Sequence, residues 1–384
     1  MTHPLYCFIL EMKIQTILSI FIFLSCFGVY SVTNPADNKT AIGYDGPYVL
    51  YTDSCVKVLS VGLSGDIKTQ YYDLGSENIN LNVISHNGDY SFDVKIQKDK
   101  KRDTWKYEQY DKTLVISDPH GNIDFVIKTL QGNGAIDKKL NWTFGNNHLM
   151  VIGDVFDRGN DVTQIFWLIY KLKQEAEQTG GKVSFLIGNH EPMILCNDMR
   201  YAEEKYKILA NSIGINYSEL FSYDTELGKW IANCNTIEVS GNYLFVHAGI
   251  GQMFYKMNVP IDVVNKEISS VLFKKNKDRK ATSELHSFLY GSEGPIWYRG
   301  LVRDKEKYHP CPSDTLALLM NRLGVEKIVV GHTKNNDISE FYDGKVIGVN
   351  VENEENLAEK KGLGILIQQK QVFVVGEKGI IRKL

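Results

Sequence analysis

Cysteine is scarce in this sequence of 384 residues, which contains six. No two cysteines stand at CxxC spacing, so a zinc site made of thiolates is not expected. Four of them follow the N-terminal region: Cys55, Cys196, Cys234 and Cys311. Disulfides between these four would suit an exported chain. Their spacing predicts no particular pairing, however, and free thiols are the simpler expectation.

An excess of positive charge is also lacking, since 43 Lys and Arg residues accompany 46 Asp and Glu residues, for a formal net charge of −3. A chain of this kind has no electrostatic footprint for a nucleic-acid polymer, so no such partner is expected. Internal repeats and low-complexity tracts are absent too. The length and the hydrophobic content of 43% are those of a folded protein with one large domain and an accessory piece, or with two domains.

The chain has no apolar run long enough to be expected as a membrane span. Its apolar stretch at 14–30 follows a short basic start and precedes polar residues, which is typical of a secretory signal. We therefore predict a signal peptide over residues 1–33, with Met12 as an alternative start, and export to the periplasm or the extracellular space. An uncleaved membrane anchor and a lipid anchor at Cys26 are the alternatives, so membrane contact is expected only through this segment.

The remaining sequence has two textures. Residues 34–108 show short alternating runs with turn signals, which predicts a small β-rich N-terminal module and a linker. The module contains no motif with chemistry of its own, and it either binds a ligand or packs on its neighbour. In residues 109–384, buried-strand runs alternate with helical patterns, which predicts an α/β domain with ligands at the carboxyl ends of strands. Residues 252–312 form a partly helical insert, which we expect to cover the site.

Five short motifs place histidine, carboxylate and glycine at the ends of apolar runs. A single histidine in such a place is more often a buried side chain than a ligand, but five motifs together predict one dinuclear metal site. The motifs are Ser117-Asp118-Pro119-His120-Gly121, Gly153-Asp154-Val155-Phe156-Asp157-Arg158-Gly159, Gly188-Asn189-His190-Glu191, His247-Ala248-Gly249 and Gly331-His332-Thr333.

The ligand types indicate how two ions would be held. Asp118 and His120 stand two apart on a stretch interpreted as extended, so both side chains point the same way and can bind one cation. Asp154 is a lone carboxylate that can bridge two cations. Imidazole and carboxylate together suit Mn, Fe or Zn, so we expect two divalent or trivalent ions of these metals. The predicted ligands are Asp118, His120 and Asp154 for the first metal, and Asp154, Asn189, His247 and His332 for the second.

Three further residues are expected to act on the substrate. Two adjacent residues of an extended stretch cannot easily face one metal, so His190 is predicted as a general acid, kept protonated by Asp157. Arg158 offers a planar fork that suits phosphate oxygens, although a surface ion pair with Asp157 is the simpler alternative. A water between two metals becomes hydroxide near neutral pH. We therefore expect in-line hydrolysis of a phosphomonoester by a metal-bridging hydroxide.

These motifs, in this order, resemble those of the calcineurin-like metallophosphoesterases, within the phosphoprotein phosphatase superfamily. The usual blocks are GDxHG, GDxxDRG, GNHE, HAG or HGG, and GH, and Ser117 replaces the first glycine. The resemblance covers about residues 113–350. It implies an α/β fold in which a central β-sandwich is flanked by helices, here preceded by the small β-rich N-terminal module.

A further block narrows the resemblance. Gly294-Pro295-Ile296-Trp297-Tyr298-Arg299-Gly300 is similar to the GPxWYRG block of the Shewanella-like protein phosphatases. By that resemblance Arg299 is a second phosphate-binding arginine, with an aromatic-packed arginine as the alternative. The Ser-Ala-Pro-Asn-Tyr block of the eukaryotic serine/threonine phosphatases is missing. Asp157 stands where purple acid phosphatases need a tyrosine ligand, which disfavours that branch.

Three functions remain as hypotheses. The first is an exported dinuclear-metal phosphatase whose substrate is a phosphorylated protein (Ser, Thr or Tyr) or a small phosphoester. The second is a nucleotide or dinucleoside polyphosphate hydrolase, since near relatives with that activity carry the same motifs. The third is a non-catalytic binding protein on the same scaffold, which is disfavoured because every predicted ligand position holds a chemically competent residue.

Overall fold

The computed structural model describes residues 42–76, 78–97 and 101–384. The predicted signal peptide at 1–33 and Cys26 lie outside the described residues. Within those ranges, no helix combines the length and the apolar character that crossing a membrane requires. The four cysteines of the described part are free, as expected, although only Cys311 is fully buried.

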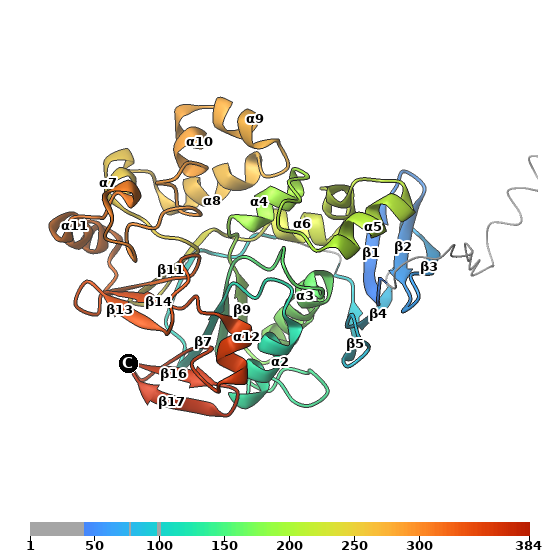
Figure 1. Cartoon of the computed structure of the whole chain (residues 1–384), viewed down its shortest axis with the longest axis horizontal. Helices are drawn as coiled ribbons and strands as arrows, with labels where there is room; N and C mark the ends of the chain where they lie inside the picture. The colour runs from blue at the N-terminus through green and yellow to red at the C-terminus, as the bar shows by residue number, and fades with distance from the viewer. Residues whose placement is uncertain (1–41, 77, 98–100) are drawn as a thin grey trace, which may run out of the picture.

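Two six-stranded sheets form the centre of the molecule (Figure 1). The first contains β7 (Lys112–Ser117), β8 (His148–Ile152), β9 (Lys182–Phe185), β15 (Gly364–Gln368), β16 (Gln371–Gly376) and β17 (Gly379–Lys383), in the order β17-β16-β15-β7-β8-β9. The second contains β6 (Lys106–Tyr107), β10 (Ile237–Ser240), β11 (Tyr243–Val246), β12 (Lys327–Val330), β13 (Ser339–Phe341) and β14 (Val346–Gly348), in the order β13-β14-β12-β11-β10-β6.

The two sheets pack face to face. Val115 and Met150 of the first sheet belong to the same buried hydrophobic cluster as Phe245 and Val329 of the second. All four side chains are fully buried, and removing such apolar surface from water is the main force that holds two sheets together. This confirms the β-sandwich that the family resemblance implied.

Strand direction brings the five motifs together. β7, β8 and β9 run parallel, and β11 runs parallel to β12 in the facing sheet. The carboxyl ends of parallel strands meet at one edge of a sheet. Each motif lies at the end of one of these five strands or within three residues after it, so residues far apart in the chain converge there.

Helices cover the sheets and fill the connections. The longest, α3 (Val162–Gln178), has most of its residues buried, since it packs between the first sheet and the N-terminal strands. The other helices before the insert are α2 (Ile123–Gly132), α4 (His190–Leu195), α5 (Glu204–Ile213), the 3₁₀ turn η1 (Tyr217–Phe221) and α6 (Glu226–Ala232). After the insert follow α11 (Ser313–Leu323) and α12 (Asn353–Ala358).

The β-rich module is present and packs closely on the rest of the chain. It consists of a three-stranded sheet, β1 (Asp45–Tyr51), β2 (Cys55–Val61) and β3 (Ile67–Asp73), and a hairpin of β4 (Asn80–Ile84) and β5 (Ser91–Lys95). Figure 1 shows it at one end of the molecule, beside α5. Trp167 of α3 donates a 2.8 Å hydrogen bond to the carbonyl of Pro47, and Tyr48 shares its buried cluster with α3. The boundary at residue 108 stays a prediction, and β6 lies before it although it joins the second sheet.

The insert is largely helical, as expected, with α7 (Gln252–Met257), α8 (Ile261–Ser270), α9 (Asn276–Ala281), α10 (Glu284–Leu289) and the 3₁₀ turn η2 (Glu306–Tyr308). α9 and α10 project at the top of Figure 1. The segment after α10 returns to the sandwich, where the N–H of Ala248 donates to the carbonyl of Pro295 at 3.0 Å. This returning segment therefore lies against the loop that carries His247. Arg279 of α9 also reaches a motif, because it donates to the carbonyl of Pro192 at 2.6 Å, directly after Glu191.

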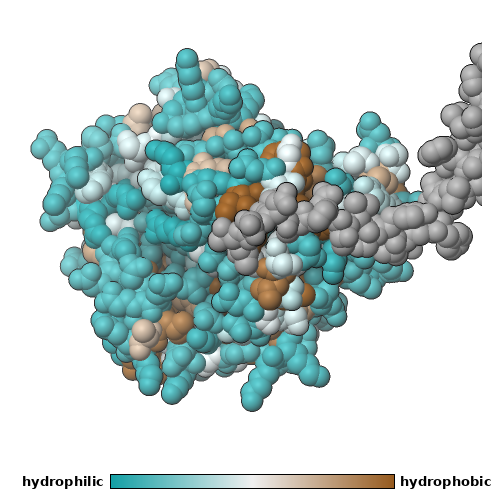
Figure 2. Space-filling view, turned by 45° about the vertical axis from the view of Figure 1, so that its right-hand side comes forward, coloured by the Kyte–Doolittle hydropathy of each residue, from teal (hydrophilic) through white to brown (hydrophobic). Residues whose placement is uncertain are grey.

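The visible surface in Figure 2 is mostly hydrophilic, with a few separate hydrophobic patches. Exposed large apolar side chains include Leu63, Tyr71 and Leu74 of the module. Scattered exposure of this kind is normal for a folded protein and marks no interface by itself.

Candidate active site

The loops that follow β7 and β8 are hydrogen-bonded to each other. The N–H of His120 donates to the carbonyl of Asp154 at 3.0 Å, and the N–H of Gly121 donates to that of Val155 at 3.0 Å. A Cβ atom on Gly121 would lie 2.6 Å from the carbonyl carbon of Gly159, closer than real Cβ contacts come. Glycine is needed at position 121 for this close approach.

Several predicted site residues have a left-handed backbone, which is uncommon for residues other than glycine. They are Asp118 (φ 50°), His120 (43°), Asp154 (56°), Asp157 (74°), Arg158 (67°) and His332 (58°). The interpretation of the Asp118–His120 stretch as extended was therefore wrong, because a tight turn closes there, with the N–H of Asn122 donating to the carbonyl of Pro119. Such conformations persist only where surrounding contacts hold them, and they cluster at functional sites.

One group of potential metal ligands consists of Asp154, His247 and His332, whose ligand atoms lie within 4.8 Å of one another. Oδ2 of Asp154 lies 3.2 Å from Nε2 of His247. The amide oxygen of Asn189 lies 3.1 Å from the same nitrogen. The structure thus brings together all four residues predicted for the second metal.

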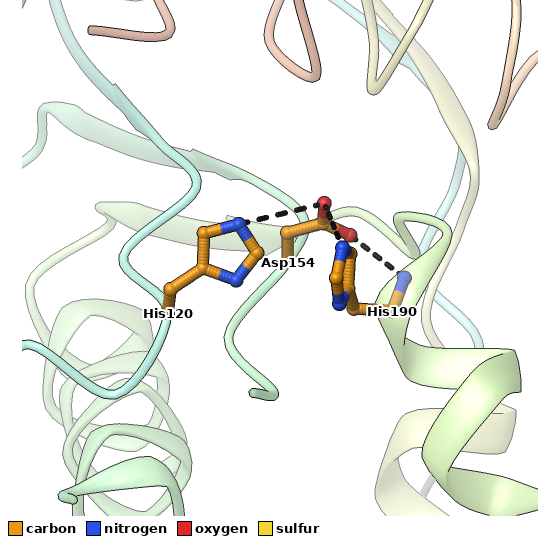
Figure 3. A group of neighbouring side chains, drawn as sticks. All are labelled: His120, Asp154 and His190. Atoms are coloured by element: carbon orange, nitrogen blue, oxygen red, sulfur yellow. Dashed lines mark hydrogen bonds and ion pairs between the residues drawn. The ribbon is translucent and has the colours of Figure 1, made fainter. Parts of the chain in front are cut away.

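A second group consists of His120, Asp154 and His190 (Figure 3). Oδ2 of Asp154 lies 3.9 Å from Nε2 of His120 and 3.8 Å from Nε2 of His190, so this one carboxylate serves both groups. Asp118 was predicted as a ligand here but lies outside both groups. Its carboxylate accepts from the N–H of His332 at 3.0 Å and from the hydroxyl of Ser117.

The imidazoles are held with one nitrogen turned toward Asp154. Nδ1 of His120 donates to the carbonyl of Phe156 at 2.8 Å, and Nδ1 of His247 donates to that of Ile152 at 2.9 Å. Hydrogen bonds of this kind fix the ring orientation of metal-binding histidines. Nε2 of buried His332 has no hydrogen-bond partner among the residues that the structure describes. An unpartnered buried nitrogen beside a carboxylate and a second imidazole fits a metal ligand.

Burial sets the charge of two of these rings. It lowers the pKa of His120 to about 3, against the attraction of Asp154, and it lowers the pKa of His332 well below its ordinary value. Both imidazoles are therefore neutral near pH 7, the form that binds a metal ion. His247 differs, because the charge of Asp154 overcomes the effect of burial and raises its pKa to about 9.

His190 faces Asp157, as predicted, through a hydrogen bond from Nδ1 to the carboxylate. The residue begins α4, so the expectation that it lies on an extended stretch was wrong. Burial lowers its pKa, but the charge of Asp154 and the bond to Asp157 outweigh burial, so the pKa is raised. His190 is thus positioned either as a metal ligand together with His120 and Asp154 or as a proton donor.

Two arginines lie beside the ligand groups. Arg158 is exposed, and its side chain lines the same cavity as Asp118 and His120. Arg299 belongs to the returning segment of the insert, and its guanidinium lies 3.3 Å from the carbonyl of His332. Arg158 thus lies beside Asp118 and His120, and Arg299 lies beside His332.

Glu191 received no role from the sequence, yet its fully buried carboxylate organises the site. It accepts from the N–H of Gly188 at 2.7 Å, of Val155 at 2.9 Å and of Asp154 at 3.1 Å. The available signal was a carboxylate within the Gly188-Asn189-His190-Glu191 block. Asn353 was also missed, and its amide donates to the carbonyl of Asp118 at 2.9 Å across 235 sequence positions. No local sequence pattern predicts a hydrogen bond between residues so far apart in the chain.

The fold and these motifs define a phosphoesterase. Residues 112–336 match the calcineurin-like phosphoesterase family, and the chain belongs to that family. It is a hydrolase of phosphoric esters, and the family implies divalent metal ions.

Particular relatives narrow the comparison. Shewanella-like protein phosphatase 1 of Plasmodium berghei is 26% identical over 243 residues, which is 61% of this chain and 66% of that protein. Shewanella-like protein phosphatase 2 of Arabidopsis thaliana is 25% identical over 271 residues, 59% of this chain and 67% of the relative. The matched region thus spans about two thirds of these curated relatives.

Solved structures extend the likeness to nearly the whole chain. One is a structure of a cold-active protein tyrosine phosphatase, which is 30% identical to this chain. The match covers 90% of this chain and 98% of that protein, with a TM-score of 0.80. A structure of the cold-active protein-tyrosine phosphatase of a psychrophilic Shewanella species gives a TM-score of 0.79 at the same identity, covering 89% of this chain and 99% of its own. Coverage of 90% of the chain must include the N-terminal strands, which lie outside the family match at residues 112–336.

Proposed function

We propose that this chain is a dinuclear-metal phosphatase that hydrolyses phosphomonoesters of proteins, phosphotyrosine included, with Mn, Fe or Zn as its metals. The observation that carries the proposal is the shared carboxylate of Asp154. Its Oδ2 lies 3.2 to 3.9 Å from Nε2 of His247, His190 and His120. Asp154 thus stands between His120 on one side and His247 on the other, as a carboxylate that bridges two neighbouring cations would.

The second ion would be held by Asp154, Asn189, His247 and His332, and the first by Asp154 and His120 with Asp118 beside them. When bound, the metals would supply Lewis acidity and lower the pKa of water for attack on phosphorus. The remaining roles belong to side chains. Arg158 and Arg299 bind the phosphate oxygens and stabilise their developing charge.

His190 completes the reaction as proton donor to the leaving oxygen. Its raised pKa keeps the ring protonated in more of the neutral range than an ordinary histidine, which suits a general acid. Asp157 accepts from Nδ1, so the proton available for transfer is on Nε2, the nitrogen that faces Asp154. Asp157 thereby orients the ring and stabilises its charged form.

Protein substrates are supported by the relatives. Both curated relatives are named protein phosphatases, and the two structures that cover nine tenths of the chain are named protein tyrosine phosphatases. Phosphopeptides carrying phosphotyrosine, phosphoserine or phosphothreonine should therefore be hydrolysed faster than nucleotides or dinucleoside polyphosphates. Release of phosphate from nucleotides but from none of the peptides would contradict the proposal.

The variant Asp154→Asn tests the metal centre. Its amide oxygen can still accept from the backbone N–H of His190, so the loop should remain folded. We expect loss of more than about 100-fold in kcat, because even residues that only support metal ligands contribute 10- to 100-fold. Metal content by elemental analysis should fall as well, whereas exposed Asp73→Asn should change neither quantity. An unchanged rate in Asp154→Asn would contradict the proposed mechanism.

A further inference from the structure

A cavity of about 550 Å³ opens beside the candidate active site. Asp118, His120 and Arg158 line one part of it. The turn at 85–90, which joins β4 to β5, lines another part, and residues 350–354 before and within α12 line a third. The N-terminal module therefore forms a wall of the space that a bound substrate would enter.

Hydrogen bonds hold this wall in place. The N–H of His86 donates to the carboxylate of Asp161 at 2.6 Å, and the hydroxyl of Tyr90 donates to that of Asp124 at 2.5 Å. Asp161 and Asp124 belong to the segments that follow the β8 and β7 motifs. The turn is thus fixed to the same loops that carry Arg158 and His120, and its distance from the site is set by the fold.

The cavity is rich in negative charge. Apart from the predicted ligand Asp118, six carboxylate residues line it, whereas Arg158 and Lys334 are the lysine and arginine residues in its lining. Lys334 and Glu352 neutralise each other as an ion pair, which leaves five of the six carboxylates, and Arg158 is assigned to the phosphate. The six are Asp89, Asp124, Asp161, Glu203, Glu352 and Glu354.

A second observation points to a donor-bearing ligand. Asn353 lines the cavity and is nine-tenths buried, and its amide oxygen has no hydrogen-bond partner among the described residues. An unpaired buried acceptor is costly unless a ligand or water satisfies it. Lysine and arginine side chains carry only donors, so carboxylates and a free amide oxygen suit them.

We propose that this cavity binds a lysine- or arginine-containing segment next to the phosphorylated residue of a protein substrate. The inference rests on the proposed function, since it assumes a phosphoprotein substrate and adds a contact outside its phosphate group. The phosphate lies at Arg158 and the predicted ligands, while the flanking cation lies between the 85–90 turn and α12. A nucleotide or polyphosphate would instead bring further negative charge against the same carboxylates.

The experiment uses three phosphotyrosine peptides of equal length with lysine, serine or glutamate beside the phosphotyrosine. The full chain should show its highest kcat/KM on the lysine peptide, and added salt should reduce the preference. In Asp89→Asn/Glu354→Gln, which removes two exposed charges, the lysine-over-serine ratio should fall about fivefold, the factor that two exposed ion pairs contribute. The charge-reversed Asp89→Lys/Glu354→Lys should prefer the glutamate peptide.

The matched control is Asp53→Asn/Asp73→Asn, which removes two exposed charges from the same module outside the cavity and should leave the ratio unchanged. Equal kcat/KM for the three peptides would overturn the inference and leave the proposed function intact. If no peptide is hydrolysed, the proposed function fails, and binding of non-hydrolysable phosphonate peptides decides about the cavity. Tighter binding of the lysine version, weakened in Asp89→Asn/Glu354→Gln, would support the inference, and equal binding would overturn it.

Discussion

The imidazole of His190 stands between two carboxylates, and its two nitrogens face different ones. Nδ1 bonds to Asp157, and Nε2 lies 3.8 Å from Asp154. A proton donor and a metal ligand differ in what their removal does. The donor matters most where the leaving oxygen is a poor leaving group, whereas a ligand matters for every substrate.

His190→Ala should therefore slow alkyl phosphates, such as phosphoserine peptides, by about 100-fold or more, the range of general acid catalysis. p-Nitrophenyl phosphate should be slowed far less, because its leaving group needs no proton. Comparison of kcat for the two substrates in wild type and variant gives the answer. Equal slowing together with loss of bound metal would identify His190 as a ligand instead.

Single residues show how far the sequence could predict the site. Asn189, His247 and His332 converge with Asp154 as expected, because strand ends and their order determine that meeting. The geometry within each loop was not predictable, since the left-handed backbone of Asp118 and His120 depends on the neighbouring loop after β8. The role of Asn353 could not be predicted, because its hydrogen-bond partner Asp118 lies far away in the sequence.

At the scale of elements, ion pairs attach the segment before β6 to α3 and β9. The carboxylate of Asp103 lies 2.8 Å from Nζ of Lys173 in α3 and 3.1 Å from Nζ of Lys182 in β9. Burial raises the pKa of Asp103, but the two lysines outweigh burial, so the pKa is lowered below its ordinary value. A lowered pKa in the folded state means that ionised Asp103 stabilises the fold.

Asp103→Asn should accordingly lower the free energy of unfolding at pH 7 by about 1 kcal/mol. The difference from wild type should stay constant above about pH 5, since Asp103 is then ionised in both folded and unfolded chains. It should shrink as the pH falls below about 4 and through the folded-state pKa. Urea denaturation at pH 7 and at pH 3 measures it, and a difference that grows in acid would contradict the assignment.

Element prediction succeeded where burial was continuous. β7, β8, β11 and β12 are buried apolar runs, and α3 shows clear helical periodicity, so the sequence predicted alternating strands and helices over residues 109–384. β3 was not predicted, because its sequence Ile-Lys-Thr-Gln-Tyr-Tyr-Asp is largely exposed and its strand form comes from pairing with β2. β6 was not predicted for a similar reason, since it has only two residues and they gain strand geometry by pairing with β10.

For the whole molecule, the main question is how the N-terminal module is coupled to the catalytic part. Lys205 of α5 forms a 3.1 Å ion pair with Asp45 of β1, and both side chains are almost fully buried. Nζ also donates to the carbonyl of Asn160 at 2.6 Å. The pair therefore links the module to the loop that carries Arg158.

Lys205→Met should lower the free energy of unfolding by about 3 kcal/mol, because it leaves the buried Asp45 carboxylate without a counter-charge. Asp45→Asn/Lys205→Met should recover a large part of that loss, since no lone charge remains. Urea denaturation of Asp45→Asn, Lys205→Met and the double variant measures the coupling. Strictly additive losses would contradict a linking role for the pair.

Export also concerns the whole chain, and we propose it from residues 1–33 alone. Expression of the full gene in a secreting host should yield a mature chain that lacks this segment, which N-terminal sequencing identifies. Deletion of residues 1–33 should leave the protein inside the cell. Recovery of labelled fatty acid on the product, lost in Cys26→Ser, would favour a lipid anchor over a cleaved soluble form.

The left-handed backbone of the site loops has a consequence for engineering. Each non-glycine residue held in this conformation costs about 1–3 kcal/mol, and six predicted site residues are held in it. Selection for heat resistance alone would therefore favour glycine or asparagine at positions such as His120 and Arg158, and under the proposed mechanism the most thermostable descendants would be inactive. A directed-evolution campaign on this enzyme needs turnover in its screen from the first round.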